Sequence, residues 1–382
     1  MRKHLNYGMV GGSLEAFIGG VHRVGIQFDG QTFLKAGCFS TNQTKNQECG
    51  AFYQLDADRV YATFEEMAKK ESQREDGIDF VIITAPNNVH YQAAKAFLLH
   101  GIHVFCEKPL CFEVEEAEEL RQLAKEKDLL FGVNYSYSGN NMVKQARELI
   151  LDGYIGDIIN VNAEYLQEYL VDDVGAEDTA MVKLSSWRKD PDVAGISNCV
   201  GDIGSHIENT VAYMTGLRVK RVAAKLDYFG QQLDLNANIL VEFDNGAHGV
   251  FCSSQVCVGH MNALIVRIFG TKGAIEWVQE NPDILYVTLK GQPVQIYHRG
   301  MGYLSKRAKE MNRIPSGHPE GLHVAFANIY KVWTNTVLKK INGEELSGYD
   351  YDFPSIEDGI EGVKFIHACV ESSKKDAAWV NL

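Results

Sequence analysis

The first 133 residues alternate short apolar runs with longer amphipathic stretches. This order is typical of β-α-β units, in which parallel strands are joined by helices that cover one sheet. Strands are expected at 6–10, 33–39, 79–84, 102–105 and 129–133, with helices at 64–70, 91–100 and 113–127. The run 79–84 is nearly all apolar, as a strand buried on both faces should be. The sequence therefore predicts an N-terminal Rossmann-type parallel sheet.

After about residue 135 the pattern changes to runs of alternating polarity, of which 159–165 is the clearest. Alternation indicates strands with one buried face and favours an antiparallel sheet. Further strands are expected at 219–229, 235–243, 247–257, 263–269, 273–278, 284–289 and 293–297, and helices at 140–152, 202–215, 319–341 and 356–373. We therefore predict an α/β protein with a Rossmann domain at 1–134. An α+β domain with a large, mostly antiparallel open sheet is predicted at 135–382, and its C-terminal helices are candidates to pack back on the first domain.

Composition narrows the possible partners and surroundings. A chain of 382 residues exceeds the size of one hydrophobic core, which favours two domains. The formal charge of −13 and the lack of a basic patch argue against nucleic acid as a partner. The eight cysteines are scattered without CxxC spacing, so we expect free thiols in a reducing compartment. No apolar run has transmembrane length and no signal peptide is expected, which predicts a cytoplasmic protein with no membrane partner.

A glycine-rich turn follows the first expected strand and reads Gly11, Gly12, Ser13, Leu14. Glycine lets a backbone approach a pyrophosphate, and the helix that follows presents N–H groups and a positive dipole end. Against the pattern G-x-G-x-x-G, Ser13 stands for the second glycine and Ala16 for the third. A tight turn without any ligand explains these residues nearly as well.

The end of the second strand should carry the residue that reads the adenosine ribose. Ser40 lies there, with no acid and no arginine beside it and only Lys45 further on. An acid would favour NAD and a positive side chain NADP. The choice between NAD and NADP therefore stays open.

Two more strand ends place candidate residues at the carboxyl edge of the sheet, where ligands bind in open α/β folds. The run 79–84 leads into Pro86, Asn87 and His90, and the run 102–105 leads into Glu107 and Lys108. Pro109 restricts Lys108 to an extended backbone and permits a cis peptide bond. Lys108 is a candidate active-site cation, although a surface lysine beside a turn proline is the commoner explanation of such a pair.

Asp202 and His206 form the second candidate pair, four residues apart in a segment of helical periodicity. Oxidation of a secondary alcohol needs a base for the hydroxyl proton, and histidine titrates near neutrality. An ammonium group such as that of Lys108 would stabilise the developing alkoxide. On spacing alone, an N-cap aspartate with an incidental histidine one turn on is the favoured explanation of the pair. No metal is expected, because the zinc-ligand spacings are absent, and Gly204-Ser205-His206 is not a G-x-S-x-G elbow.

Six segments in the same order resemble the glucose-fructose oxidoreductase, inositol dehydrogenase and rhizopine catabolism (Gfo/Idh/MocA) family. They read MVGGS, TAPNNVH, CEKPL, SSWRKDP, GDIGSH and DFPSIEDGIEGVKF, and they span the chain from the first strand to the last helix. The most specific are Glu107-Lys108-Pro109 and the run from Gly201 to His206.

The resemblance implies a role for each candidate residue. Lys108 would contact the substrate hydroxyl and the nicotinamide ribose, His206 would act as acid and base, and Asp202 would position the pair. The dinucleotide would be lined by Gly11, Gly12, Ser13, Leu14, Ser40, Pro86, Asn87, His90, Glu107 and Lys108. The substrate wall would include Tyr135, Trp187, Arg188 and His318. The family also implies a homodimer or homotetramer formed through the C-terminal sheet.

Three functions are weighed on these residues. The leading hypothesis is an NAD(P)-dependent dehydrogenase that moves a hydride between a ring hydroxyl of a sugar or cyclitol and nicotinamide. The first alternative is a glycoside hydrolase that retains its NAD and shows no net absorbance change at 340 nm. The second is a non-catalytic dinucleotide or sugar sensor, since a fold by itself never fixes function. The sequence leaves open which sugar or cyclitol is the substrate and in which direction the reaction runs.

Overall fold

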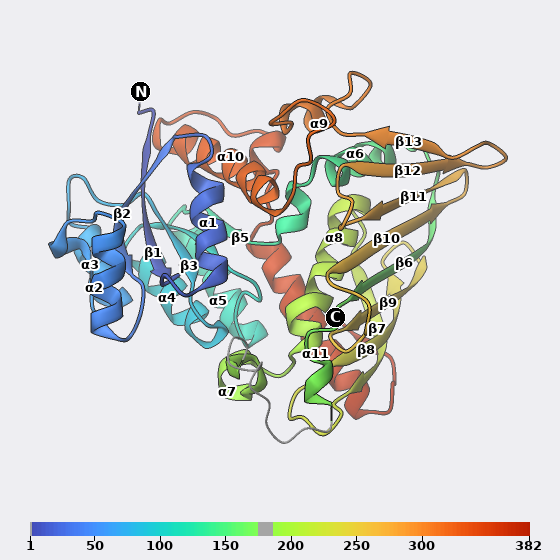
Figure 1. Ribbon diagram of the computed structural model, residues 1–382, viewed down its shortest axis with the longest axis horizontal. Helices are drawn as coiled ribbons and strands as arrows, with labels where there is room; N and C mark the ends of the chain where they lie inside the picture. The colour runs from blue at the N-terminus through green and yellow to red at the C-terminus, as the bar shows by residue number, and fades with distance from the viewer. Residues whose placement is uncertain (1, 175–185) are drawn as a thin grey trace. The chain divides into compact units, whose positions relative to one another are not determined.

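The computed structural model describes residues 2–174 and 186–382 (Figure 1). The chain divides into two compact units, each assembled from two stretches of sequence. The first unit comprises Met1–Ser136 and Leu322–Ile360, and the second comprises Tyr137–Gly321 and Glu361–Leu382. The first unit thus includes helix α10 (Leu322–Ile341), which the sequence places nearly two hundred residues later.

The first unit contains a five-stranded parallel sheet in the order β2-β1-β3-β4-β5, which confirms the predicted Rossmann-type fold. The strands are β1 (Leu5–Gly11), β2 (Thr32–Cys38), β3 (Phe80–Thr84), β4 (His103–Cys106) and β5 (Phe131–Val133). The helices between them are α1 (Phe17–Gln27), α2 (Gln43–Phe52), α3 (Phe64–Glu71), α4 (His90–Leu99) and α5 (Val114–Glu126).

Helices cover both faces of this sheet, which is why β3 is buried along its whole length. On one face Trp333 of α10 packs edge-on against Phe80 and Phe105. On the other face the side chain of Met67 from α3 fills the space beside Gly8. The run 79–84 is nearly all apolar because helices bury both faces of β3, as predicted.

The strand order reverses at β1, whose neighbours β2 and β3 lie on opposite sides of it. In open α/β sheets, ligands bind at the carboxyl ends of the strands beside such a switch point. The turn after β1 and the loop after β3 meet there. The site predicted from the glycine-rich turn therefore lies where this topology favours ligand binding.

Helix α2 is an element that hydrophobic periodicity did not predict. Its buried positions are Asn46, Cys49 and Gly50, so it has no apolar stripe to recognise. Asn46 takes the place of an apolar anchor: its side chain accepts a hydrogen bond from the backbone N–H of Phe39 and donates one to the carbonyl of Tyr61.

The second unit contains a nine-stranded sheet in the order β13-β12-β11-β10-β6-β9-β8-β7-β14. The pair β6–β9 is parallel and the other neighbours are antiparallel, as the prediction of a mostly antiparallel sheet requires. The strands are β6 (Ile158–Leu166), β7 (Val219–Asp227), β8 (Asn236–Phe243), β9 (His248–Ser254), β10 (Ala263–Gly270), β11 (Gly273–Val278), β12 (Ile284–Leu289), β13 (Gln295–His298) and β14 (Val380–Asn381).

In the part of the chain that the structure describes, helices cover one face of this sheet and leave the other open (Figure 1). The covering helices include α6 (Asn141–Leu151), α8 (Ser205–Thr215) and the part of α11 (Ile356–Lys374) that lies in the second unit. The core between them includes Phe251, Trp277 and Phe365. On the opposite face, Leu240 and Val250 are directly paired across β8 and β9 and are 51% and 45% exposed.

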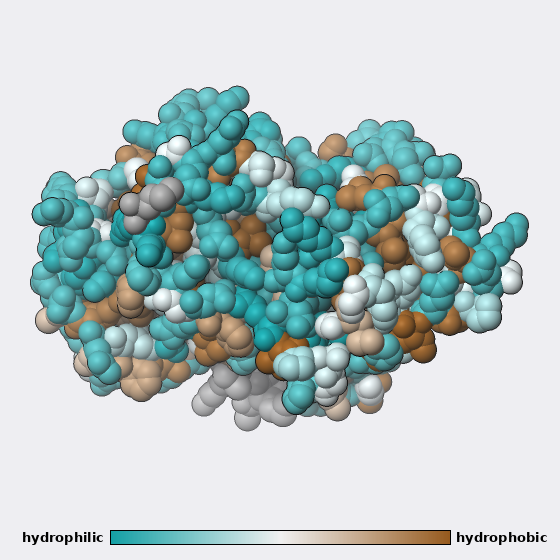
Figure 2. All heavy atoms as spheres, turned by 90° about the horizontal axis from the view of Figure 1, so that it is seen from above, coloured by the Kyte–Doolittle hydropathy of each residue, from teal (hydrophilic) through white to brown (hydrophobic). Residues whose placement is uncertain are grey.

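Hydrophilic side chains cover most of the face shown in Figure 2, and apolar ones occur there in separate patches. Within residues 2–174 and 186–382, no helix combines the length and the apolar character needed to cross a bilayer. All eight cysteines are free thiols, five of them buried and three half-buried, as the scattered spacing predicted.

Candidate active site

The turn after β1 has a backbone that only glycine adopts easily. Gly11 and Gly12 both have positive φ, 77° and 71°. A side chain at Gly11 would meet the backbone nitrogen of Ala85 at 2.6 Å, because the turn lies directly against the loop after β3. Both glycines of the weak sequence pattern are therefore required by the structure.

Helix α1 follows this turn with an N-terminus suited to an anion. Its N-cap is Ala16, which makes no side-chain capping bond, and its first turn contains no acidic residue. The amide groups and the positive dipole end of α1 are thus not occupied by side chains. Ser13 and Leu14 lie in the turn before this N-terminus. A pyrophosphate fits such a cradle.

A third glycine completes the turn, and it is one that the sequence pattern did not identify. Ala16 stands where the pattern has its last glycine, but the close approach between helix and turn is made by Gly19. An added Cβ at Gly19 would lie 2.4 Å from the Cα of Gly12. A motif extended by three residues would have included Gly19, which makes the close contact between helix and turn that the pattern assigns to position 16.

The region expected to read the adenosine ribose contains Ser40 after β2. Its hydroxyl accepts a hydrogen bond from the backbone N–H of Asn42, which in turn caps α2. The ammonium group of Lys45 lies 2.7 Å from the carboxylate of Glu15. Lys45, the positive side chain that follows Ser40 in the sequence, therefore already has an acidic partner.

His90 at the start of α4 holds two loops together. Its Nδ1 lies 2.8 Å from the carbonyl oxygen of Pro109, and its Nε2 lies 2.9 Å from that of Ala85. Burial lowers the pKa of His90, and the two carbonyl groups oppose that shift. Pro86 and Asn87 lie in the short segment between Ala85 and His90. His90 thus ties the loop after β3 to the loop after β4.

Glu107 is buried at the end of β4, and its carboxylate has three donors. His22 of α1 approaches Oε1 at 2.7 Å, the side-chain amide of Asn134 donates to the same oxygen, and the backbone N–H of Lys108 donates to Oε2 at 3.0 Å. Burial raises the pKa of Glu107, but the hydrogen bond and charge of His22 and the charge of Lys108 outweigh it and bring the pKa to about 2. The group is ionised at neutral pH.

Lys108 follows directly and is half-buried, and its peptide bond to Pro109 is cis. The first unit therefore brings together the glycine turn, the loop after β3 and the segment from Glu107 to Pro109. Tyr135 belongs to the same unit and is 1% exposed.

In the second unit Asp202 and His206 lie on either side of a helix start. The predicted α-helix at 202–215 begins three residues later, at Ser205, and is preceded by a π-helical turn, Val200–Gly204. Asp202 is inside that turn, so the N-cap explanation is wrong, because the N-cap residue of α8 is Gly204. π-helical turns are rare and frequently occur at functional sites.

Asp202 has partners that sequence spacing could not identify. Its Oδ2 accepts a hydrogen bond from the side-chain amide of Gln255 at 3.0 Å and lies 3.5 Å from the Nε of Arg188. The guanidinium of Arg188 stacks over the ring of Trp187 at 4.7 Å. The structure thus groups Asp202 with Trp187 and Arg188, two of the residues assigned to the substrate wall.

His206 is half-buried at the start of α8, among aromatic rings. The ring of Tyr137 contacts it edge-on with centroids 5.0 Å apart, and that of Tyr165 lies at 6.3 Å. The hydroxyl groups of Tyr137 and Tyr165 are hydrogen-bonded to one another. These rings restrict the orientation of the imidazole. Neither tyrosine nor Gln255 was predicted, because no motif links them to Asp202 or His206.

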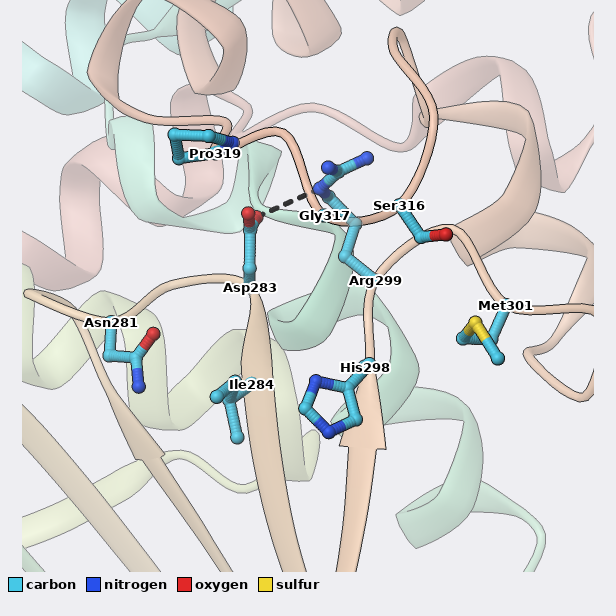
Figure 3. A pocket seen from close by; sticks show the side chains of 9 residues that line it. All are labelled: Asn281, Asp283, Ile284, His298, Arg299, Met301, Ser316, Gly317 and Pro319. Atoms are coloured by element: carbon cyan, nitrogen blue, oxygen red, sulfur yellow. Dashed lines mark hydrogen bonds and ion pairs between the residues drawn. The ribbon is translucent and has the colours of Figure 1, made fainter.

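His318 lies in an exposed loop. Its chain neighbours Gly317 and Pro319 line a cavity of about 370 Å³ (Figure 3). The cavity is lined by Asn281, Asp283, Ile284, His298, Arg299, Met301, Ser316, Gly317 and Pro319, and so includes none of the predicted site residues. Arg299 fastens the loop: it is ion-paired with Asp283 and Glu320 and donates a hydrogen bond to the carbonyl oxygen of His318. In the described part of the chain, no group of three or more His, Cys, Asp or Glu side chains could hold a metal ion.

Comparison with known proteins identifies the family. Residues 5–135 match the model of the oxidoreductase family with NAD-binding Rossmann fold, and residues 143–276 match that of the GFO/IDH/MocA C-terminal domain. The chain belongs to the GFO/IDH/MocA oxidoreductase family. It is therefore an NAD-binding oxidoreductase, as the resemblance predicted.

Three relatives illustrate the similarity. An uncharacterized oxidoreductase of Bacillus subtilis, YfiI, is 36% identical over 99% of this chain and 97% of its own. An inositol dehydrogenase homolog from Azotobacter vinelandii is 34% identical and covers all of this chain and 98% of its own. Its crystal structures with NAD+ and with NADH and myo-inositol give TM-scores of 0.93 and 0.91. Levoglucosan dehydrogenase of Pseudarthrobacter phenanthrenivorans is 26% identical over 80% of both chains.

Proposed function

We propose that this oxidoreductase catalyses reversible oxidation of a ring hydroxyl on a sugar or cyclitol, with Lys108 and His206 as the acid–base pair. The proposal rests on the residues at the end of one strand, β4, and at the start of one helix, α8. Glu107 fixes Lys108 after β4, while Asp202 and His206 flank the start of α8. The similarity to an inositol dehydrogenase homolog and to levoglucosan dehydrogenase supports the substrate class.

The nicotinamide dinucleotide would be held by the turn at Gly11–Leu14 and by the amino end of α1. Gly11, Gly12 and Gly19 allow the turn to pack tightly, since a Cβ at any of them would clash with neighbouring protein atoms, and the end of α1 has no capping side chain. When bound, the nicotinamide ring supplies the acceptor for the hydride. Ser40, with Lys45 already paired to Glu15, favours NAD over NADP, because a 2′-phosphate would need a positive partner.

The chain's own residues would then move the proton. His206 would accept the hydroxyl proton as the C–H bond breaks and return it in the reverse direction. The ammonium group of Lys108 would stabilise the developing alkoxide. Asp202, held by Gln255 and Arg188, would position the pair, and the rings of Tyr137 and Tyr165 would fix the imidazole. Tyr135, Trp187, Arg188 and His318 would read the substrate.

A screen of cyclitols and sugars with NAD+ and NADP+ tests the proposal, with reduced cofactor followed at 340 nm. Lys108→Ala and His206→Asn should each lower kcat by about 100-fold or more, because general acid–base groups contribute on that scale. Calorimetry should show that both variants still bind NAD+. Lys95→Ala removes a lysine that is half-buried, as Lys108 is, and is paired with Glu119; it is the matched control and should keep wild-type turnover.

Two outcomes would contradict the proposal. Undiminished turnover in Lys108→Ala would remove the acid–base assignment. Turnover of a glycoside with co-purified NAD and no net change at 340 nm would instead establish the hydrolase alternative.

The open face of the nine-stranded sheet supports a homodimer or homotetramer. Leu240, Val250 and Ile296 are exposed apolar side chains on strands of this sheet, and Arg267 lies between the carboxylates of Glu164 and Glu276. Leu240 and Val250 pair directly across β8 and β9, and exposed apolar neighbours of this kind mark candidate protein–protein contacts.

A further inference from the structure

A buried relay of side chains ends on the carboxylate beside Lys108. His22 of α1 is fully buried, and Tyr330 of α10 is 2% exposed. The Nδ1 of His22 is hydrogen-bonded to the Tyr330 hydroxyl, and its Nε2 lies 2.7 Å from Oε1 of Glu107. All three residues belong to the first unit.

Both oxygens of Glu107 are used by this arrangement. Oε1 receives His22 and the amide of Asn134, whereas Oε2 receives the backbone N–H of Lys108 at 3.0 Å. A carboxylate held at both oxygens has a fixed orientation. The hydrogen bond to Oε2 therefore fixes the backbone from which the Lys108 side chain extends.

Aromatic rings hold the imidazole of His22 in turn. Phe326 contacts it edge-on with centroids 5.0 Å apart, Phe105 lies at 6.4 Å, and Tyr330 packs against both His22 and Phe105. His22 thus cannot tilt without displacing a packed ring. Packing against α10 thus fixes His22 of α1, and His22 in turn orients Glu107 at the end of β4.

We propose that His22, oriented by Tyr330, is a positioning residue for Lys108 and acts through the carboxylate of Glu107. The inference rests on the proposed function, in which Lys108 acts on the substrate hydroxyl. His22 would not touch the substrate. A displacement of the reacting group by about 1 Å can cost on the order of 100-fold in rate, so the relay controls kcat.

The relay also keeps Glu107 ionised, which gives the inference a distinct signature. Burial favours the neutral form of Glu107, and His22 is the main group that reverses this preference. Without His22 the pKa of Glu107 should rise, because burial is then opposed only by Lys108 and Asn134. A protonated Glu107 loses an acceptor, so Lys108 is released at the same pH at which Glu107 gains its proton.

The experiment compares kcat, KM and pH profiles of the full chain with those of His22→Leu, His22→Gln, Tyr330→Phe and His103→Leu. His22→Leu should lower kcat by about 10- to 100-fold, with a smaller change in KM for the polyol. It should also acquire an acid limb that wild type lacks, at the pH where Glu107 gains its proton. His22→Gln keeps an amide donor toward Glu107 and should recover most of the activity. Tyr330→Phe keeps the ring and should give an intermediate loss.

A second measurement uses protein without ligand. With His22→Leu, Glu107 keeps its proton to a higher pH than it does in the unfolded chain. The thermal midpoint of His22→Leu relative to that of the double variant His22→Leu/Glu107→Gln should therefore fall as pH rises from about 5 to 7. Both proteins lack His22, and the double variant has no carboxyl group at position 107, so the slope reports Glu107 alone. His103→Leu removes another buried histidine of the first unit and should lower stability without lowering kcat or adding an acid limb.

The outcomes separate the inference from the proposed function. If Lys108→Ala keeps its turnover, the proposed function fails. If Lys108→Ala is inactive while His22→Leu and Tyr330→Phe retain wild-type kcat and show no acid limb, the function stands and the inference is overturned. A loss in His22→Leu that only parallels the loss of folded protein, as in His103→Leu, also overturns it.

Discussion

The contact between helix α1 and the glycine turn predicts opposite effects for two neighbouring glycines. Gly19 and Gly20 are consecutive residues of α1. A Cβ at Gly19 would lie 2.4 Å from the Cα and 3.1 Å from the carbonyl carbon of Gly12, whereas a Cβ at Gly20 meets nothing within 4 Å. Alanine is therefore a steric probe at Gly19 and a control at Gly20.

The expected magnitude follows from these distances. Carbon atoms normally pack about 3.5–4.0 Å apart, so Gly19→Ala forces the turn and the helix apart by roughly 1 Å. The atoms in contact are backbone atoms, which cannot rotate away as a side chain can. Overpacking of this kind costs about 1–3 kcal/mol. Both variants gain the helix propensity of alanine, about 0.5–1 kcal/mol, so the gain cancels in the comparison.

Thermal unfolding and dinucleotide calorimetry provide the assay. Gly19→Ala should unfold below Gly20→Ala by roughly 2–4 °C per kcal/mol, and it should bind NAD+ more weakly because the turn at Gly12 is displaced. Gly20→Ala should match or exceed wild-type stability and keep wild-type affinity. Equal midpoints and equal affinities for the two variants would refute the close-packing role of Gly19.

Two further predictions concern pH and assembly. Burial and the charge of Lys340 lower the pKa of His103 to about 4. Between pH 6.5 and 4 the imidazole of His103 is protonated in the unfolded chain but stays neutral in the folded chain. About 3 kcal/mol of stability present above pH 6.5 should therefore be lost as pH falls toward 4. His103→Asn retains an acceptor for the backbone N–H of Leu130 and should flatten this slope in pH-dependent unfolding; an unchanged slope would assign it to other groups. Leu240→Arg together with Val250→Arg should reduce the molar mass measured by light scattering. Leu151→Arg, at an exposed apolar position of α6, should leave it unchanged, and equal masses for all proteins would exclude the open face as the interface.

Much of the fold could be predicted because strand signals depend on local sequence. The five parallel strands and the eight long strands of the second sheet lie where apolar runs or alternation predicted them, within about three residues at each end. Helix α2 was missed because its buried contacts are made by Asn46, Cys49 and Gly50, which no periodicity reveals. The two-residue strand β14 is too short to leave a pattern, since it exists through its pairing with β7.

Within the candidate site, the sequence determined the residue types and the tertiary structure decided their partners. Gly11, Gly12, Glu107, Lys108, Asp202 and His206 were found from motifs, because backbone conformation and chemistry at those positions demand particular residues. Gln255 lies 53 residues from Asp202 along the chain, His22 lies 85 residues from Glu107, and Tyr330 lies 308 residues from His22. Such contacts depend on how distant helices and strands pack, which no local pattern records. The sequence by itself determined that a lysine, an acid and a histidine are available for chemistry, and only the tertiary structure decided how each one is held.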